Sequence, residues 1–237
     1  DLGAANLAGA DFLNADLRES NLEVVDLEGA NLTDANLKHT YLLYANFQGA
    51  KLARVKWDGA SHLNWEQIKK VGEEKDRDWK GAEEAYRHLK NYFHQEGKYD
   101  DESKAYYREK LMAKKRAFAE GKKWRGRVLA LYQALTGFGN KPLWTVGWAA
   151  AVIAFFGFLY WGGGTAGLFQ FAFKPEMLPH LNFFSYIYLS VVTFATLGFG
   201  DITPLNWQAQ IPVIIEVIMG YVFLGLIITI IARRFGR

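Results

Sequence analysis

The hydrophobic positions of residues 1–57 recur with a fixed period of five. This period matches neither the period of about 3.6 of an α-helix nor the period of about two of a β-strand. A short fixed period of this kind indicates stacked repeats, so we predict a solenoid over residues 1–57. The positions that define the period are Leu2, Leu7, Phe12, Leu17, Leu22, Leu27, Leu32, Leu37, Leu42, Phe47, Leu52 and Trp57.

The segment that follows changes to a helical pattern. Residues 81–119 have the spacing of two amphipathic helices that are broken near residues 97–100. We therefore expect an α-helical hairpin inside a linker domain at 58–124. Residues 125–141 begin with basic side chains and continue with apolar ones, which is typical of a helix lying in a membrane interface.

Charged residues then almost disappear. None occurs between Lys141 and Lys174, and Glu216 alone occurs between Asp201 and Arg233. A bilayer core of ~30 Å needs ~20 apolar helical residues, so we predict membrane spans at 143–161 and 209–232. The rest of the chain is too polar to surround two such helices, which argues against a soluble protein with both helices buried.

Between these spans lies an apolar segment that is too short to cross. Residues 182–195 have the length typical of a re-entrant or buried helix, and Asn182 is a suitable N-cap. In the next six residues, 196–201, glycines at alternate positions permit left-handed backbone and let successive carbonyls point to one side. Such carbonyls can replace the water around a cation, and the C-terminal dipole of the short helix favours positive charge there.

The sequence Thr-Leu-Gly-Phe-Gly-Asp at 196–201 resembles the Thr-Val-Gly-Tyr-Gly-Asp filter of potassium channels. Residues 142–233 also resemble their two-transmembrane pore module, and we assign 142–237 to this all-α domain. The resemblance implies a homotetramer, since one chain supplies only one strand of a filter that must surround the ion. Phe199 lacks the hydroxyl of the commoner tyrosine, which leaves the rigidity and selectivity of the filter open. The implied filter residues are Thr196, Leu197, Gly198, Phe199 and Gly200, with K⁺ held by the carbonyls of the first four and by the Thr196 hydroxyl.

The resemblance also implies roles outside the filter. Asp201 is expected at the outer mouth, with Tyr188 as a candidate hydrogen-bond partner. Gly220 and Gly225 stand where related inner helices have gating hinges, although small residues that allow close helix packing explain them equally well. The expected pore-lining residues are Tyr221, Leu224, Ile228 and Ala232, of which the last two are candidates for a hydrophobic constriction. Glu216 is the single intramembrane carboxylate, and we favour a buried hydrogen bond behind the short helix over a proton sensor.

Two further resemblances concern the N-terminal half. The five-residue repeat resembles the pentapeptide-repeat family, which implies a right-handed quadrilateral β-helix of about three turns with ~4.8 Å between turns. The hairpin resembles one tetratricopeptide unit, which implies an adaptor rather than a solenoid of its own. The residues that carry the second resemblance are Ala85, Tyr86, Arg87, His88, Leu89, Phe93, Gly97, Tyr99, Ala105, Tyr106 and Tyr107. The fold class is therefore a multidomain membrane protein: β-helix, α-hairpin adaptor and two-transmembrane pore module.

Loop charge predicts the orientation. Residues 114–127 are strongly basic, and Arg233, Arg234 and Arg237 follow the second span, whereas the segment between the spans holds only Lys174, Glu176 and Asp201. The positive-inside rule then places both termini in the cytoplasm. The N-terminus is polar, so we expect no secretory signal. The basic run lies just before a span, and we favour contact with anionic lipids over nucleic acid as its role.

Composition excludes several other functions. With 28 Lys+Arg against 25 Asp+Glu in 237 residues, the net charge of +3 gives no general argument for nucleic-acid binding. The absence of cysteine excludes a disulfide framework, a thiol nucleophile and a zinc finger. The five histidines have no ligand spacing, and no phosphate loop or Ser/His/Asp grouping can be assembled. We therefore expect no enzyme activity and no cofactor, with K⁺ as the permeant ion only.

The first functional hypothesis is a prokaryotic plasma-membrane potassium channel that conducts passively. Its repeat and hairpin domains would form a cytoplasmic assembly or regulatory module, open to an unknown cytoplasmic regulator. The alternatives are a membrane-anchored interaction scaffold with a vestigial pore, and a non-selective cation channel. The spans contain no arginine-rich voltage sensor, so we expect the gating signal to come through the N-terminal half or through segments outside this sequence. The repeats start abruptly at Asp1, and we expect the natural chain to begin earlier.

Overall fold

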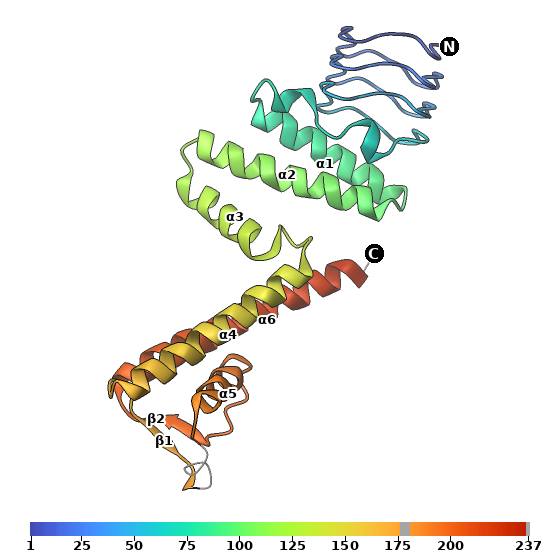
Figure 1. The fold of residues 1–237 in the computed structure, drawn as a ribbon. Helices are drawn as coiled ribbons and strands as arrows, with labels where there is room; N and C mark the ends of the chain where they lie inside the picture. The colour runs from blue at the N-terminus through green and yellow to red at the C-terminus, as the bar shows by residue number, and fades with distance from the viewer. Residues whose placement is uncertain (176–180, 236–237) are drawn as a thin grey trace. The chain divides into compact units, whose positions relative to one another are not determined.

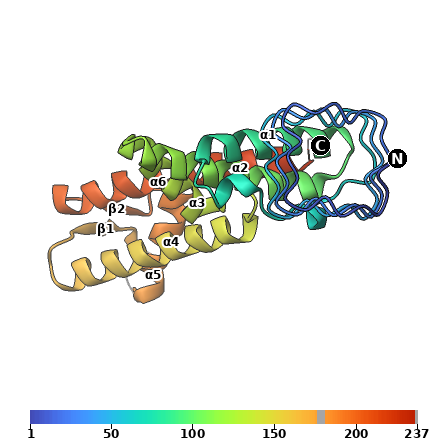
Figure 2. The ribbon, with the colours of Figure 1, turned by 90° about the horizontal axis from the view of Figure 1, so that it is seen from above.

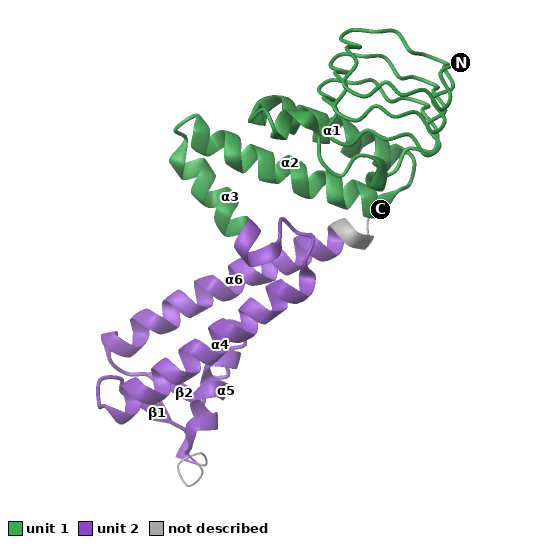
Figure 3. Cartoon of the chain, turned by 45° about the horizontal axis from the view of Figure 1, so that its top comes forward, with its two compact units in different colours: residues 1–132 green, residues 133–237 purple. Residues whose placement is uncertain are grey.

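The computed structural model describes residues 1–175 and 181–235, with the backbone alone for 233–235. The side chains of Arg233, Arg234, Arg237 and Glu176, which entered the orientation argument, lie outside the described residues. The chain divides into two compact units, Asp1–Tyr132 and Gln133–Arg237 (Figure 3). This division is coarser than the four segments drawn from the sequence, and each unit is described by itself.

The N-terminal repeats form stacked coils of four five-residue units. Parallel bridges join residues twenty positions apart, as Asn6 with Asp26 and Asp26 with Asn46, and the last bridge joins Tyr41 to Ser61. Viewed from above, successive coils superimpose on a four-sided outline (Figure 2). The repeating Leu or Phe points inward, and from Leu22 onward these side chains are almost completely buried. The stack thus continues four residues beyond Trp57, the last centre read from the sequence.

Two helices close the C-terminal end of the stack. After 3-10 turns at Trp65–Gln67 and Gly72–Glu74 come α1, Trp79–Gln95, and α2, Tyr99–Ala119. Buried side chains of both helices, among them Phe93 and Met112, belong to the same hydrophobic cluster as the solenoid leucines. The hairpin therefore completes the core of the solenoid, a packing role that the adaptor interpretation did not foresee.

A buried carboxylate ends the hydrogen-bond ladder of the solenoid. Within the stack each coil donates N–H groups to carbonyls of the next, as Leu32 N to Lys51 O at 2.9 Å. In the last coil the acceptor is instead Glu73 Oε1, which lies 2.7 Å from Leu52 N and 2.6 Å from Ala53 N. The second carboxylate oxygen is buried and has no hydrogen-bond partner among the residues that the structure describes. Burial raises the pKa of the Glu73 carboxyl above its usual 4.5.

This cap predicts a pH dependence that Glu73→Gln removes. Because the folded pKa lies above the unfolded value, the stabilisation from Glu73 is complete below pH ~4.5 and declines as pH rises through the raised pKa. Glutamine keeps the oxygen that accepts from both amides but does not titrate. We expect hydrogen-exchange protection of Leu52 and Ala53 to fall with pH in the wild type relative to Glu73→Gln, whereas Glu73→Ala should be about 1–3 kcal/mol less stable than Glu73→Gln at every pH. A wild-type-to-Gln difference that is constant with pH would contradict this assignment.

Unit 2 begins inside α3, Lys123–Thr136, and contains two long helices with a short one beside them (Figure 1). The long helices are α4, Pro142–Thr165, and α6, Trp207–Phe235, and the short one is α5, Phe183–Phe194. All three helices pack against one another. Two short strands, β1 at Phe171–Phe173 and β2 at Ile202–Pro204, pair antiparallel between them.

Hydrogen bonds fix the elbow between α3 and α4. The connection turns sharply through Gly137, Phe138 and Gly139, all with positive φ. From α4, Thr145 Oγ1 donates to the Leu135 carbonyl at 3.2 Å and Trp148 Nε1 donates to the Ala134 carbonyl at 3.1 Å. These side chains satisfy carbonyls that the end of α3 leaves without helical partners. The end of α3 is thereby held to the start of α4.

The two long helices have the length and composition of membrane spans. Each contains an apolar stretch long enough to cross a membrane, and only 28% of that stretch in α4 and 22% in α6 is buried within the described part of the chain. The core helix of a soluble protein would be mostly buried. These exposed apolar surfaces indicate that unit 2 belongs in a membrane.

Candidate functional site

The short helix α5 is fixed at its start by a capping box. The Asn182 side chain accepts from Phe184 N at 2.8 Å, and the Ser185 hydroxyl accepts from Asn182 N at 3.3 Å. This arrangement satisfies N–H groups that the first helical turn leaves free. Asn182 is thus the N-cap that the sequence predicted.

The backbone after α5 alternates in handedness. Thr196, Gly198 and Gly200 have φ of 56°, 56° and 71°, whereas the residues between them do not have positive φ. Alternation of left- and right-handed dihedrals turns successive peptide groups so that their carbonyls can face one side. From the sequence, left-handed backbone was expected only at the two glycines. It was not expected at Thr196, because a β-branched residue rarely adopts a positive φ.

The inner end of this segment is anchored to the helix that precedes it. Thr196 N donates to the Thr193 carbonyl at 3.0 Å, and Leu197 N donates to the Val192 carbonyl at 2.9 Å. Both carbonyls belong to the last turn of α5, where helical partners run out. The first two residues of the candidate filter therefore continue directly from the helix end.

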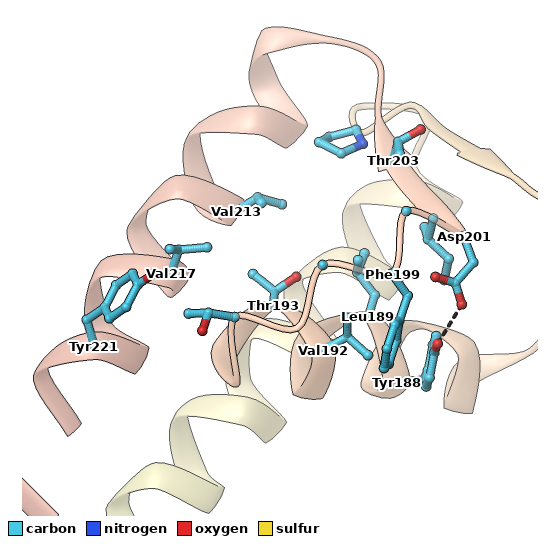
Figure 4. A pocket seen from close by; sticks show the side chains of 15 residues that line it. Tyr188, Leu189, Val192, Thr193, Phe199, Asp201, Thr203, Val213, Val217 and Tyr221 are labelled. Atoms are coloured by element: carbon cyan, nitrogen blue, oxygen red, sulfur yellow. Dashed lines mark hydrogen bonds between the residues drawn. The ribbon is translucent and has the colours of Figure 1, made fainter. Parts of the chain in front are cut away.

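The outer end of the segment is held by a side-chain contact. Tyr188 of α5 donates its hydroxyl to Asp201 Oδ2 at 2.5 Å, and the two side chains point toward one another (Figure 4). The structure thus brings together the pair that the sequence named. Phe199 lies in the sequence between the inner attachment at residues 196–197 and the outer one at Asp201, and it is 59% exposed in the single chain.

A cavity of about 400 Å³ lies beside the segment. The alternating backbone and α5 line one part of it, and α6 lines another through Val213, Val217 and Tyr221 (Figure 4). Tyr221 is therefore the pore-lining candidate that lies near the filter. The other three predicted pore-lining residues do not line this cavity. They follow Tyr221 along α6 and are exposed in the single chain: Leu224, Ile228 and Ala232.

The two glycines of α6 have different surroundings. A Cβ at Gly220 would collide with the Phe194 carbonyl oxygen at the end of α5, whereas a Cβ at Gly225 would meet no atom within 4 Å. The close approach at Gly220 favours the packing interpretation for that residue. Gly225 stays a candidate hinge, and its carbonyl accepts from Thr229 Oγ1 at 2.7 Å.

Alanine substitutions test whether Gly220 and Gly225 differ in this way. Gly220→Ala should destabilise unit 2 by about 1–3 kcal/mol, because the added methyl group displaces α5 from α6. Gly225→Ala should be neutral or stabilising by about 0.5–1 kcal/mol, because alanine is the better helix former and the space is open. Thermal unfolding of the purified protein in detergent measures both. Equal melting temperatures for Gly220→Ala and the wild type would refute the packing role.

Glu216 links all three helices of unit 2 by hydrogen bonds, next to the candidate filter segment. Its side chain is completely buried, and its carboxylate accepts from Tyr160 Oη of α4 at 2.6 Å and from the Ser190 hydroxyl of α5. Ser190 Oγ also lies 2.8 Å from the Ile153 carbonyl. The buried hydrogen bond expected from the sequence is confirmed. Its partners were not predicted, because they come from helices distant in the sequence.

Two family models match separate parts of the chain. Residues 163–237 match the family model described as an ion channel. Residues 1–34 and 25–56 match the pentapeptide-repeat model, with eight copies. The resemblances of the pore region and of the five-residue repeats are therefore confirmed, whereas the resemblance of the hairpin to a tetratricopeptide unit stays a prediction.

Two solved structures are similar to the repeat region. A pentapeptide repeat protein from the cyanobacterium Cyanothece 51142 is 38% identical over 27% of this chain and 39% of its own, with a TM-score of 0.16. A second, from Nostoc Pcc 7120, is 29% identical over 27% of this chain and 60% of its own, with a TM-score of 0.13. The chain thus spans less than two thirds of either protein. No curated protein matches it.

Proposed function

Because the chain joins an ion-channel region to pentapeptide repeats, we propose that it is a potassium-selective channel. One observation carries the proposal: backbone of alternating handedness at 196–200 follows a short helix and lies between two helices of membrane length. Irregular backbone at membrane depth is tolerated only where it is buried in protein or lines an aqueous path. In this role the carbonyls of Thr196, Leu197, Gly198 and Phe199 replace the water around K⁺.

The conducting form in this proposal is a homotetramer. A single chain leaves the candidate filter open on one side, and Leu197 and Phe199 are both more than half exposed. Four copies around an axis would surround the ion and cover these side chains. The exposed Tyr221, Leu224, Ile228 and Ala232 would then line the inner pore or the contacts between subunits.

The proposed setting is a prokaryotic plasma membrane with both termini in the cytoplasm. The basic run at 114–127 would lie near anionic lipid headgroups. The coils of residues 1–61, as a right-handed quadrilateral β-helix, and the hairpin that closes them would form a cytoplasmic assembly or regulatory module.

Flux in reconstituted vesicles tests the proposal. K⁺ uptake far above Na⁺ uptake supports it, whereas equal rates would indicate a non-selective cation channel. Absence of flux under every condition, with the protein tetrameric or not, would favour the membrane-anchored scaffold. The same assay with and without residues 1–120 tests the regulatory role of the N-terminal module, since an unregulated pore would conduct equally in both.

A further inference from the structure

The two-stranded sheet of unit 2 connects distant parts of the chain at the filter exit. Strand β2 starts at Ile202, directly after Asp201, and pairs with β1, which lies between α4 and α5 in the sequence. The register sets Phe171 opposite Pro204, Ala172 opposite Thr203 and Phe173 opposite Ile202. The segment that leaves the filter is therefore paired along its whole strand with the loop after the first span.

The ladder reaches Asp201 itself. Lys174 N donates to the Asp201 carbonyl at 2.9 Å, and at the other end Leu205 N donates to the Gln170 carbonyl at 2.8 Å. In an antiparallel pair, hydrogen-bonded positions alternate, so Ala172 and Thr203 form the hydrogen-bonded pair between these two. Asp201 is consequently held twice: its carboxylate by Tyr188 and its carbonyl by the backbone of Lys174.

The start of α6 extends the same connection. The Asn206 side chain accepts from Gln170 N at 3.1 Å and donates to the Leu168 carbonyl at 2.8 Å. It also accepts from Ala209 N in the first turn of α6. The loop that carries β1 is thus tied to both ends of the short segment between the filter and the second span.

Aromatic packing holds β1 against the two other helices. The Phe171 ring lies 5.8 Å from Tyr160 of α4 and 6.0 Å from Tyr186 of α5, between ring centroids. The Phe173 ring lies 6.1 Å from Tyr186. Ring pairs at these distances add to the stability gained from apolar burial. The strand is therefore a packed element that can resist displacement of its partner.

We infer that β1 is a positioning strand that fixes the outer end of the filter through the backbone bond from Lys174 to Asp201. The inference deepens the proposed function and depends on it. The Phe199 ring carries no group that could donate a hydrogen bond to the surrounding helices. The residues after Phe199 must therefore restrain the outer carbonyls. Asp201 is the residue that receives both a side-chain hydrogen bond, from Tyr188, and a backbone hydrogen bond, from Lys174.

Loss of this strand should change how the filter holds ions rather than whether the protein folds. If the outer carbonyls become more mobile, they discriminate less between K⁺ and Na⁺. The filter also loses its conducting geometry sooner while the channel is held open. Both effects are properties of the conducting filter. A purely structural role for β1 would instead lower tetramer yield and melting temperature while leaving selectivity unchanged.

Lys174→Pro is the most direct test, measured with the full-length protein in planar bilayers. Proline removes the donor N–H, and its restriction on Phe173 favours the extended backbone that this residue already has. Lys174→Gln is the matched control, since it removes the same charge and keeps the donor. Ala172→Pro against Ala172→Ser repeats the comparison at the centre of the ladder, in case one proline prevents folding.

We expect both proline variants to form the same oligomer as the wild type, to lose at least about five-fold in K⁺-over-Na⁺ permeability and to show current decay at least about five-fold faster, since about five-fold is what the loss of a single hydrogen bond predicts and every subunit of the proposed homotetramer loses one. The Gln and Ser variants should match the wild type. Proline variants with wild-type selectivity and decay would refute the inference, and so would a change in melting temperature alone. A wild-type protein that does not conduct would refute the proposed function instead, which keeps the two failures distinct.

Discussion

Gly198→Ala is expected to abolish K⁺ flux through the reconstituted protein. Gly198 has φ of 56°, a conformation that costs an L-residue with a side chain about 1–2 kcal/mol. Every filter strand of the proposed homotetramer carries the substitution, so the cost is paid about four times over, on the order of 4–8 kcal/mol. Since each 1.4 kcal/mol corresponds to about a tenfold change in population, the conducting filter should become too rare to detect.

The surroundings of Gly198 make this substitution interpretable. Apart from its two neighbours in the chain, a Cβ there would meet no atom of the described residues within 4 Å, so the expected effect comes from the backbone dihedral rather than from a collision. Gly147→Ala is the matched control, because Gly147 lies in α4 with equally open surroundings and no positive φ. ⁸⁶Rb⁺ uptake into vesicles compares the variants. Wild-type uptake by Gly198→Ala would contradict the assignment of 196–200 as the ion path.

The sequence alone predicted the repeats, the two long helices and the short helix between them, and it named the candidate site. The five-residue period, the two uncharged stretches and the filter-like hexad each depend on residues close together in the chain, and local pattern reports them directly. The predicted spans at 143–161 and 209–232 fall inside α4, Pro142–Thr165, and α6, Trp207–Phe235, which extend between one and four residues further at each end. Helix ends are set by capping and turns, which periodicity does not resolve.

The features that the sequence could not provide all come from contacts between distant residues. Glu73 reaches back about twenty residues to close the solenoid ladder, and Lys174 meets Asp201 across the whole of α5. A single glutamate or a single lysine is not part of a repeating pattern, so its structural role cannot be predicted from periodicity. Strand β1 is too short, at three residues, for alternation to be recognised. Left-handed backbone at Thr196 likewise depends on what holds the end of α5, since threonine itself disfavours it.

Glu216→Leu should destabilise unit 2 by about 1–3 kcal/mol for each hydroxyl that it leaves without an acceptor. The carboxylate is completely buried and accepts from Tyr160, and leucine cannot accept. Water cannot compensate inside a bilayer. The melting temperature in detergent should fall, and flux should fall with it, because Glu216 connects α6 to both α4 and α5 behind the filter.

Glu216→Gln is expected to keep stability close to that of the wild type, which separates hydrogen bonding from charge. The amide oxygen can accept from Tyr160, and the amide N–H₂ can donate to Ser190 Oγ, which leaves the serine hydroxyl free to donate to the Ile153 carbonyl 2.8 Å away. Tyr160→Phe in the Glu216→Leu background removes the stranded hydroxyl and should recover part of the lost stability, since replacing both partners costs less than removing one. If Glu216→Gln instead lowers the melting temperature as much as Glu216→Leu, the residue acts through its charge, and the hydrogen-bonding account of this three-helix junction is wrong.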